Sequence, residues 1–215
     1  MGKNPKPPPR TGLLFGSFNP VHIGHLALAA YFLGENYVDE VWFVVSPQNP
    51  HKRRETLLPF HHRVELLRRA VGDDSRLRVS EVERHMPLPS YTVQTMRLLL
   101  DRYPHHPFFL IMGSDNALGF PKWKECAWLA RNCHFLVYPR LKEGRVQDAL
   151  PAKDPLYENF VFAKAPVIEI TATLIRHWVG QGRSVRHLMP EAAWRYLDEM
   201  NFYKSPPRLL KSSLK

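Results

Sequence analysis

The sequence predicts an α/β fold, a doubly wound parallel sheet with helices on both faces and a small helical part at the C-terminal end. Short apolar runs alternate along the chain with longer segments whose apolar residues recur at helical spacing. The 215 residues, 44% of them hydrophobic and 23% charged, suffice for one domain with its own core. Ligands of such sheets bind beyond the carboxyl ends of the strands, so the strand-to-helix loops are where we look for chemistry.

The first third of the chain predicts two strands and two helices. Residues 11–16 are a short apolar run ending in glycine, and residues 40–46 are rich in β-branched and aromatic residues, so both predict buried strands. Residues 22–32 carry apolar side chains at helical spacing, and residues 59–71 do so after a proline in the first turn. Residues 46–58 contain Pro, Asn, Lys and Arg and predict a loop.

The middle of the chain repeats this alternation. Residues 76–83 alternate in polarity and predict a third strand. A proline-broken loop at 85–90 leads into a helix at 91–103. Residues 107–113 form the most apolar run, which we expect at the centre of the sheet. Residues 114–131 predict a helix broken at its internal proline.

The last third is less regular. Residues 134–138 predict a fifth strand, and residues 140–159 have little periodicity and predict a loop. Beyond this loop the pattern predicts short strands and then helices, at 160–162, 167–169, 171–180 and 190–200.

Both ends of the chain differ in composition from the segment between them. The formal net charge is +10, and residues 1–10 and 204–215 together contain seven of the 30 Lys and Arg with no Asp or Glu. Residues 11–203 hold 23 basic and 20 acidic residues, so the predicted domain is only mildly basic. The ends are rich in Pro, Ser and Lys, and we expect disordered tails and no specific nucleic-acid partner.

Composition also limits the compartment. No apolar run approaches the ~20 residues of a membrane span, and the first ten residues lack the apolar stretch of a secretory signal. Cys126 and Cys133 are not in CxxC spacing, which argues against a disulfide framework and a zinc site. We therefore expect a cytoplasmic protein with reduced thiols and no membrane partner.

The loop after the first predicted strand carries the most informative string, GSFNPVHIGH, which begins at Gly16. The glycine allows a tight turn, and Asn19 can cap the following helix. His22 and His25 share one face of its first turn, where free N–H groups and the helix dipole favour an anion. Gly24 between them leaves room for a flat ligand. Together these features suit the phosphate chain of a nucleotide.

Two other interpretations of the histidines are open from the residues alone. A histidine at a helix start commonly caps or packs the first turn. A pair three residues apart can also bind a metal ion, but no third ligand follows at a suitable spacing. The length of the complete string favours the phosphate interpretation.

The string resembles the first motif of the HxGH nucleotidyltransferase superfamily, which is related to the class I aminoacyl-tRNA synthetases. The second motif of that superfamily, I-S-x-T-x-x-R, is similar to the segment from Ile170 to Arg176, where Thr171 replaces serine and keeps the hydroxyl. At a helix start, Thr173 can cap or bind a phosphate oxygen, and the arginine can hold phosphate oxygens in a fork. The resemblance implies a Rossmann-like sheet and nucleotidyl transfer.

Further segments resemble bacterial nicotinate-nucleotide adenylyltransferases. They are SPQNPHK from Ser46, SYT from Ser90, MGSDN from Met112 and FPKW from Phe120. The resemblance runs from about residue 12 to residue 203. Enzymes of that family join ATP and nicotinate mononucleotide to give deamido-NAD and pyrophosphate, in NAD biosynthesis.

The resemblance implies two sets of binding residues. The expected ATP set is Gly16, Ser17, Phe18, His22, Gly24, His25, Thr173 and Arg176. The expected mononucleotide set is Asn49, Tyr91, Thr92, Asp115, Trp123, Lys124 and Arg140. The expected catalytic residues, which donate to phosphate oxygens or hold the departing pyrophosphate, are His22, His25, Lys52 and Arg176. We expect Mg²⁺ to arrive with ATP, without a metal site of the protein's own.

The residue types of the mononucleotide set fit a pyridine nucleotide. Trp123 offers an aromatic face to the ring, and an acid after a strand, here Asp115, commonly accepts from ribose hydroxyls. From the residues alone, the first is equally well explained as a core side chain and the second as a helix cap. Tyr91 and Thr92 begin a helix whose N–H groups would hold a carboxylate and disfavour an amide. Arg140 is our candidate for the mononucleotide phosphate.

Two alternatives stay open. Another enzyme of the superfamily would use nicotinamide mononucleotide, pantetheine phosphate or a flavin nucleotide as the acceptor. A module of a different class would bind nucleic acid through the basic ends. In-line attack by an acceptor phosphate, already anionic, needs neither a general base nor a covalent enzyme intermediate, and the sequence shows no nucleophile paired with a base. The oligomeric state is left open.

Overall fold

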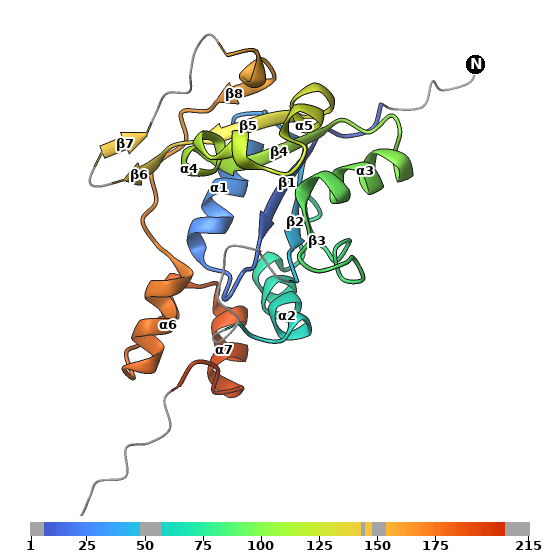
Figure 1. Ribbon diagram of the computed structural model, residues 1–215. Coiled ribbons are helices and arrows are strands. Elements are labelled where there is room, and N and C mark those ends of the chain that lie inside the picture. The colour runs from blue at the N-terminus through green and yellow to red at the C-terminus, as the bar shows by residue number, and fades with distance from the viewer. Residues whose placement is uncertain (1–6, 48–56, 143–144, 148–153, 205–215) are drawn as a thin grey trace, which may run out of the picture.

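The computed structural model describes residues 7–47, 57–142, 145–147 and 154–204, and it contains one main sheet flanked by helices (Figure 1). The strands of that sheet are β1 (Thr11–Gly16), β2 (Glu40–Val45), β3 (Leu77–Ser80), β4 (Phe108–Gly113), β5 (His134–Tyr138) and β8 (Phe160–Phe162). The helices are α1 (Ile23–Gly34), α2 (Phe60–Val71), α3 (Thr92–Arg102), α4 (Ser114–Leu118), α5 (Cys126–Asn132), α6 (Ala172–Gly180) and α7 (Glu191–Glu199).

The six strands are parallel and lie in the order β3-β2-β1-β4-β5-β8. The chain builds the sheet outward from β1 to the edge strand β3, then crosses back to β4 and builds toward β8. This confirms the predicted doubly wound sheet, and it places β4, the most apolar strand, between β1 and β5. The reversal of direction between β1 and β4 is where such sheets open a ligand crevice.

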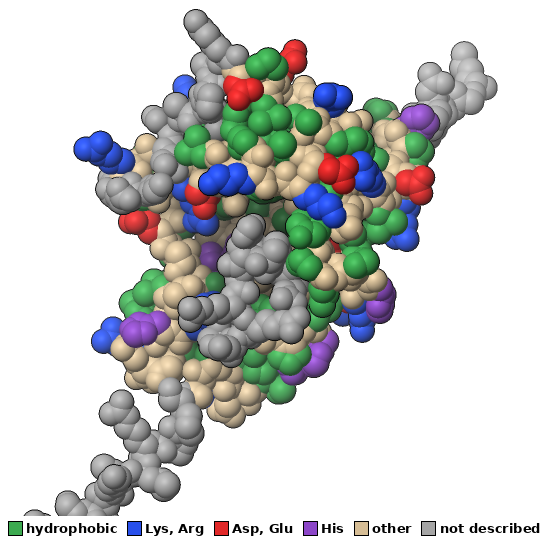
Figure 2. Space-filling model, viewed as in Figure 1, with side chains coloured by type: hydrophobic (Ala, Val, Ile, Leu, Met, Phe, Trp, Pro, Cys, Tyr) green, Lys and Arg blue, Asp and Glu red, His purple; other side chains and the backbone are tan. Residues whose placement is uncertain are grey.

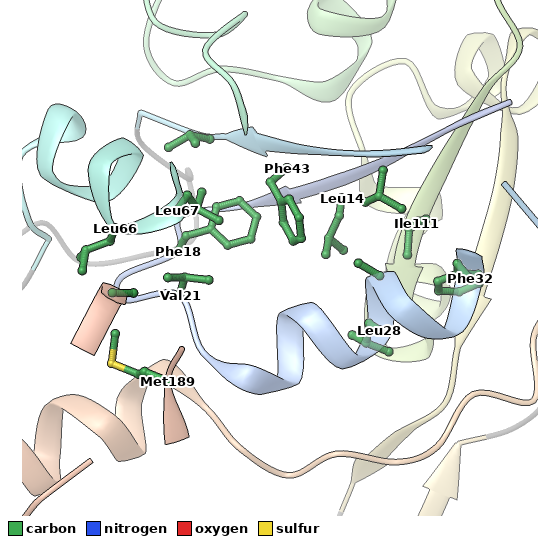
Figure 3. Packing of buried hydrophobic residues seen from close by; sticks show 14 of the residues in the cluster. Leu14, Phe18, Val21, Leu28, Phe32, Phe43, Leu66, Leu67, Ile111 and Met189 are labelled. Atoms are coloured by element: carbon green, nitrogen blue, oxygen red, sulfur yellow. The ribbon is translucent and has the colours of Figure 1, made fainter. Parts of the chain in front are cut away.

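Successive side chains of each strand enter two different cores, as the pleat of a strand requires. In β2, Val41 and Phe43 pack with α1, α2, α6 and α7 on one face, whereas Trp42 and Val44 pack with α3 and α5 on the other. Figure 3 shows the first core, where Phe43, Leu14 and Ile111 of the sheet lie close to α1, and Phe18 and Val21 of the following loop complete it. Because both faces are covered, the central strands β1, β2, β4 and β5 are mostly apolar.

The small helical part lies beyond the sheet. Helices α6 and α7 follow the last strand at the lower end of the view in Figure 1, and α7 packs against α2. Its apolar residues, among them Ile175 and Leu197, join the core around α1 and α2, so this part is an extension of the same domain. The predicted limits of the domain, 11 and 203, and the tails on either side of it stay predictions. No helix within the described ranges is long and apolar enough to cross a membrane.

Four predicted elements differ from the structure. The strand expected at 76–83 ends at Ser80, because a turn follows. The helix expected at 114–131 is broken around its proline as predicted, but the break is longer: α4 ends at Leu118, Pro121 lies in a short 3-10 helix, η2 (Phe120–Lys122), and α5 begins only at Cys126. The loop expected at 140–159 contains a small hairpin, β6 (Arg140–Lys142) and β7 (Arg145–Gln147), and a 3-10 turn, η3 (Pro155–Tyr157). Residues 167–169 form no strand, because their apolar side chain Ile168 lines a cleft instead of a sheet.

Candidate active site

Two pockets open at the carboxyl ends of the parallel strands and meet there. The larger, about 850 Å³, contains both motif histidines, and we call it the histidine pocket. The second, about 490 Å³, contains Trp123, and we call it the tryptophan pocket. The residues that line both pockets come from β1, from the start of α4 after β4 and from the end of β5; they are Leu14, Phe15, Gly16, Asp115, Asn116 and Tyr138. We call these residues the junction, which lies at the reversal point of the sheet.

The two motif histidines form one stacked unit at the start of α1. His22 is the N-cap residue, and its ring lies 3.7 Å from that of His25, centroid to centroid. The backbone N–H of His22 donates to Nδ1 of His25 at 3.2 Å. Because Nδ1 is the acceptor, a neutral His25 carries its proton on Nε2 and can donate it to a ligand. The expectation that Asn19 caps the helix is wrong.

Phe18, Gly16 and Gly24 pack around this pair of histidines. Phe18 is buried, with a positive φ of 44° that is costly for a bulky residue, and its ring meets the His25 ring edge-on at 5.0 Å. Gly16 makes room for that ring, because a Cβ there would lie 2.9 Å from it. A Cβ on Gly24 would lie 3.0 Å from the His22 ring and 3.3 Å from Ile168, so this glycine already has protein neighbours where the sequence suggested space for a ligand.

Asn19 instead ties the loop after β1 to distant parts of the chain. Its Oδ1 accepts from the backbone N–H of Leu58 at 3.1 Å and from the hydroxyl of Tyr203 at 2.5 Å. Its carbonyl oxygen accepts from Nη1 of Arg176 at 2.6 Å. Burial raises the pKa of Tyr203 well above its usual value, so the phenol stays protonated and donates. The backbone carbonyl of Asn19 therefore holds the second motif against the first, and its side chain holds Leu58 and Tyr203.

The start of α6 forms another wall of the histidine pocket. Thr171 is its N-cap and accepts from the N–H of Leu174, so the capping role predicted for Thr173 belongs to Thr171. The hydroxyl of Thr173 accepts from Nη2 of Arg176 at 3.2 Å and lines the pocket with it. The N-terminal ends of α1 and α6 both face this pocket, which therefore favours an anion.

The end of β4 supplies the acid of the junction. Asp115 lies in the first turn of α4, whose N-cap is Gly113, so it does not cap that helix. The Nε of Arg140 lies 4.0 Å from its Oδ1. A Cβ on Gly113 would overlap the Asp115 carboxylate and lie 2.9 Å from the Arg140 side chain, so a larger residue there would push Asp115 aside. Arg140 lines the histidine pocket, and its predicted contact with the mononucleotide phosphate stays a prediction.

The tryptophan pocket combines an aromatic ring with a helix start. Trp123 is half-buried and packs on Phe120 at 5.6 Å, so it is both a core side chain and a pocket wall. Tyr91 is the N-cap of α3, no side chain caps that helix, and Thr92 follows in the pocket. The first N–H groups of a helix have no acceptor within it, so they are available to a ligand. Lys124 places Nζ 4.6 Å from the centre of the Tyr91 ring.

Two buried charged residues of the site were missed by the sequence analysis. Glu83 is 2% exposed, lines the tryptophan pocket, and accepts from the hydroxyls of Ser90 and Thr95 at 2.8 and 2.7 Å. Arg63 of α2 is 1% exposed and reaches the loops after β1 and β2. Neither residue belongs to a motif, and only SYT, which contains Ser90, points toward either of them.

The remaining candidates are placed differently. Asn49 and Lys52 lie outside the described residues, and their roles stay predictions. Within the described ranges, no three His, Cys, Asp or Glu side chains are grouped closely enough to hold a metal ion. Figure 2 shows Lys and Arg intermingled with Asp and Glu on the visible face of the described part, so no broad basic surface gathers there.

Comparison with known proteins places this geometry in a class. Residues 13–178 match the cytidylyltransferase-like family model, so the chain is a nucleotidyltransferase. Two curated relatives, each called a probable nicotinate-nucleotide adenylyltransferase, come from Christiangramia forsetii and Bacteroides fragilis. The first is 40% identical over 91% of this chain and 98% of its own length. The second is 41% identical over 86% of this chain and 90% of its own length. The chain belongs to the nicotinate-nucleotide adenylyltransferase family.

A solved structure shows the same fold. The nicotinic acid mononucleotide adenylyltransferase of Plasmodium falciparum, complexed with NaAD, superposes with a TM-score of 0.75 at 17% identity. The match covers 90% of this chain and 97% of that one. This likeness confirms the Rossmann-like architecture.

Proposed function

We propose that this protein transfers the adenylyl group of ATP to nicotinate mononucleotide, giving deamido-NAD and pyrophosphate. The observation that carries the proposal is the pair of pockets that meet at the junction of β1 and β4. One pocket is built for phosphates and the other for an aromatic ring with an anionic group. Family membership supports the same reaction.

In the histidine pocket, the triphosphate lies between the starts of α1 and α6. His22 and His25 donate to phosphate oxygens, and Arg176 with Thr173 holds the β- and γ-phosphates. Because the described side chains supply a single carboxylate at the junction, Asp115, the site fits a Mg²⁺ ion held mainly by the oxygens of ATP. Bound in that way, Mg²⁺ neutralises charge on the triphosphate.

In the tryptophan pocket, the pyridine ring lies against Trp123. The carboxylate of nicotinate receives hydrogen bonds from the first N–H groups of α3, after Tyr91. A nicotinamide would present its own N–H donors to these groups, which disfavours it. Lys124, above the tyrosine ring, adds a positive charge beside the same group. Asp115 at the junction accepts from a ribose hydroxyl.

The acceptor phosphate and the α-phosphate of ATP then meet at the junction. An oxygen of the mononucleotide phosphate attacks the α-phosphorus, a new P–O bond forms, and the bond to the bridging α–β oxygen breaks as pyrophosphate leaves. The nucleophile is already anionic, so the site supplies position and charge rather than a base. Arg140 lies beside Asp115 in the histidine pocket, and we propose that it contacts the phosphates of both substrates where they meet at the junction.

The test is pyrophosphate release with Mg-ATP and, separately, nicotinate mononucleotide, nicotinamide mononucleotide and pantetheine phosphate. Strong preference for nicotinate mononucleotide is expected. Equal use of both pyridine nucleotides would remove the role given to the start of α3 and leave the reaction class intact. Turnover with pantetheine phosphate alone would refute the acceptor and the stacking role of Trp123. A Trp123→Phe variant that keeps the affinity for the mononucleotide, beside a Trp123→Ala variant that loses it, would support the stacking.

A further inference from the structure

The largest fully buried side chain among the described residues is an arginine. Arg63, on α2, is 1% exposed, and three of its nitrogens donate to four backbone carbonyl oxygens. Nε donates to Leu58 at 2.9 Å, and Nη2 donates to Pro47 at 2.9 Å. Nη1 donates to two carbonyls at once, Ser17 at 2.8 Å and Ser46 at 2.7 Å. Within the described ranges it has no ion pair with a carboxylate.

This arrangement is expensive for the fold. A buried cation without a carboxylate loses its hydration, and burial lowers the pKa of Arg63 to about 10. An apolar side chain of similar volume would fill the same space without that cost. The carbonyls therefore indicate what the guanidinium contributes, because its planar fork fixes several oxygens in one geometry.

The oxygens held by Nη1 belong to the two pockets. Ser17 lies in the loop between β1 and the motif histidines and lines the histidine pocket. Ser46 follows β2 and lines the tryptophan pocket. One nitrogen atom thus bridges the two loops, one from each side of the junction. The hydrogen bonds between β1 and β2 end just before these two loops. The last of them runs from the Ser46 N–H to the carbonyl of Gly16.

We propose that Arg63 is a positioning residue that fixes the two pockets relative to each other. The inference rests on the proposed adenylyl transfer, in which one substrate in each pocket must bring its phosphate into line with the other. Displacement of one pocket by about 1 Å leaves each substrate its own contacts but costs on the order of 10²-fold in the reaction step. Loss of Arg63 therefore lowers kcat and leaves the separate affinities nearly unchanged.

The experiment compares Arg63→Lys with Leu67→Ala. The lysine variant keeps the charge but loses the fork. The control residue is one turn further along α2, is fully buried, lines neither pocket, and its truncation destabilises the same core. Rates are measured below the unfolding transition of both variants. The affinities of a non-hydrolysable ATP analogue, of nicotinate mononucleotide and of deamido-NAD are measured by calorimetry.

For Arg63→Lys we expect kcat about 10²-fold lower and each separate substrate affinity within about threefold of wild type. The affinity for deamido-NAD, which spans both pockets, should fall about tenfold or more. Leu67→Ala should lower the melting temperature and leave kcat within about twofold. Equal kcat values for the two variants, or a rise in one KM in place of the fall in kcat, would overturn the positioning role. Wild-type protein without turnover would instead refute the proposed reaction.

A second variant covers the case in which Arg63→Lys does not fold. Arg63→Ala is measured with millimolar guanidinium chloride, which can occupy the vacated site. Saturable recovery of kcat supports the role. Recovery of the folded circular-dichroism signal without recovery of kcat overturns it.

Discussion

Replacing His25 by asparagine separates the two hydrogen bonds that the proposed mechanism assigns to its ring. Nδ1 accepts from the backbone N–H of His22 at 3.2 Å, and Nε2 is left to donate. The Oδ1 of asparagine lies close to the position of Nδ1 and keeps the capping bond, but nothing reaches the position of Nε2. The helix start is therefore retained while the donor to the transition state is lost.

The magnitude follows from the kind of group removed. Loss of one preorganised donor to developing charge costs about 2.7–4 kcal/mol, so kcat of His25→Asn should fall about 10²- to 10³-fold. His25→Ala should lose the same factor and also about 1 kcal/mol of folding stability, because the capping acceptor goes with the ring. Glutamine, whose amide reaches the position of Nε2, should recover part of the rate.

The assay is the initial rate of pyrophosphate release at saturating substrates, with urea denaturation of each variant as the control for folding. A His25→Asn enzyme that is folded and turns over within threefold of wild type would refute the assignment of the donor. A His25→Asn enzyme as unstable as His25→Ala would refute the capping argument.

Three further predictions concern the surroundings of the site. Asn19→Ala should cost about 2 kcal/mol in urea denaturation, because two partly buried donors, the Tyr203 hydroxyl and the backbone N–H of Leu58, lose their acceptor at about 1 kcal/mol each; a cost below about 0.5 kcal/mol would contradict this. Gly113→Ala should lower kcat/KM about tenfold by pushing Asp115 aside, with Gly34→Ala, whose Cβ meets no atom within 4 Å, as an unaffected control. Burial raises the pKa of the Cys133 thiol from 9.0 to about 12, so its contribution to stability is complete below pH 9. As the pH rises toward 12, the free energy of unfolding should fall by at most about 1.4 kcal/mol per pH unit. The same fall of stability with pH in Cys133→Ala would contradict this.

The sequence predicts the sheet well because its four central strands, β1, β2, β4 and β5, are buried on both faces. Apolar runs such as 107–113 have no competing interpretation in a chain that alternates strands with amphipathic helices. Segment 167–169 begins with two apolar residues, but there Ile168 lines the wall of a cleft and is only partly buried. An apolar run in the sequence predicts that its side chains are buried, but it does not predict whether a strand or the wall of a cleft buries them.

The site divides in a similar way. The histidines, and the threonine and arginine of the second motif, are grouped by short spacings, and the structure brings them to one pocket. The roles of Glu83 and Arg63 are not predicted, because in the sequence each resembles an ordinary charged residue, one at the end of an expected strand and the other on a helix. Their partners become visible only in space, since Arg63 reaches Ser17 across 46 residues and Glu83 is surrounded by hydroxyls of the next segment.

The contacts of Asn19 have a consequence for the time at which the enzyme becomes active during its synthesis. Asn19 binds Arg176, 157 positions further along the chain, and Tyr203, 184 positions further along. The loop after β1 therefore completes its contacts only after residue 203 has been synthesised. A nascent chain that ends after β8 has all the strands of the main sheet but lacks Arg176 of α6. We expect nascent chains that end before α6 to bind no ATP, so that adenylyl transfer begins only after α6 has been synthesised. Stalled chains of increasing length, probed with a photoreactive ATP analogue, would show labelling before residue 176 if this were wrong.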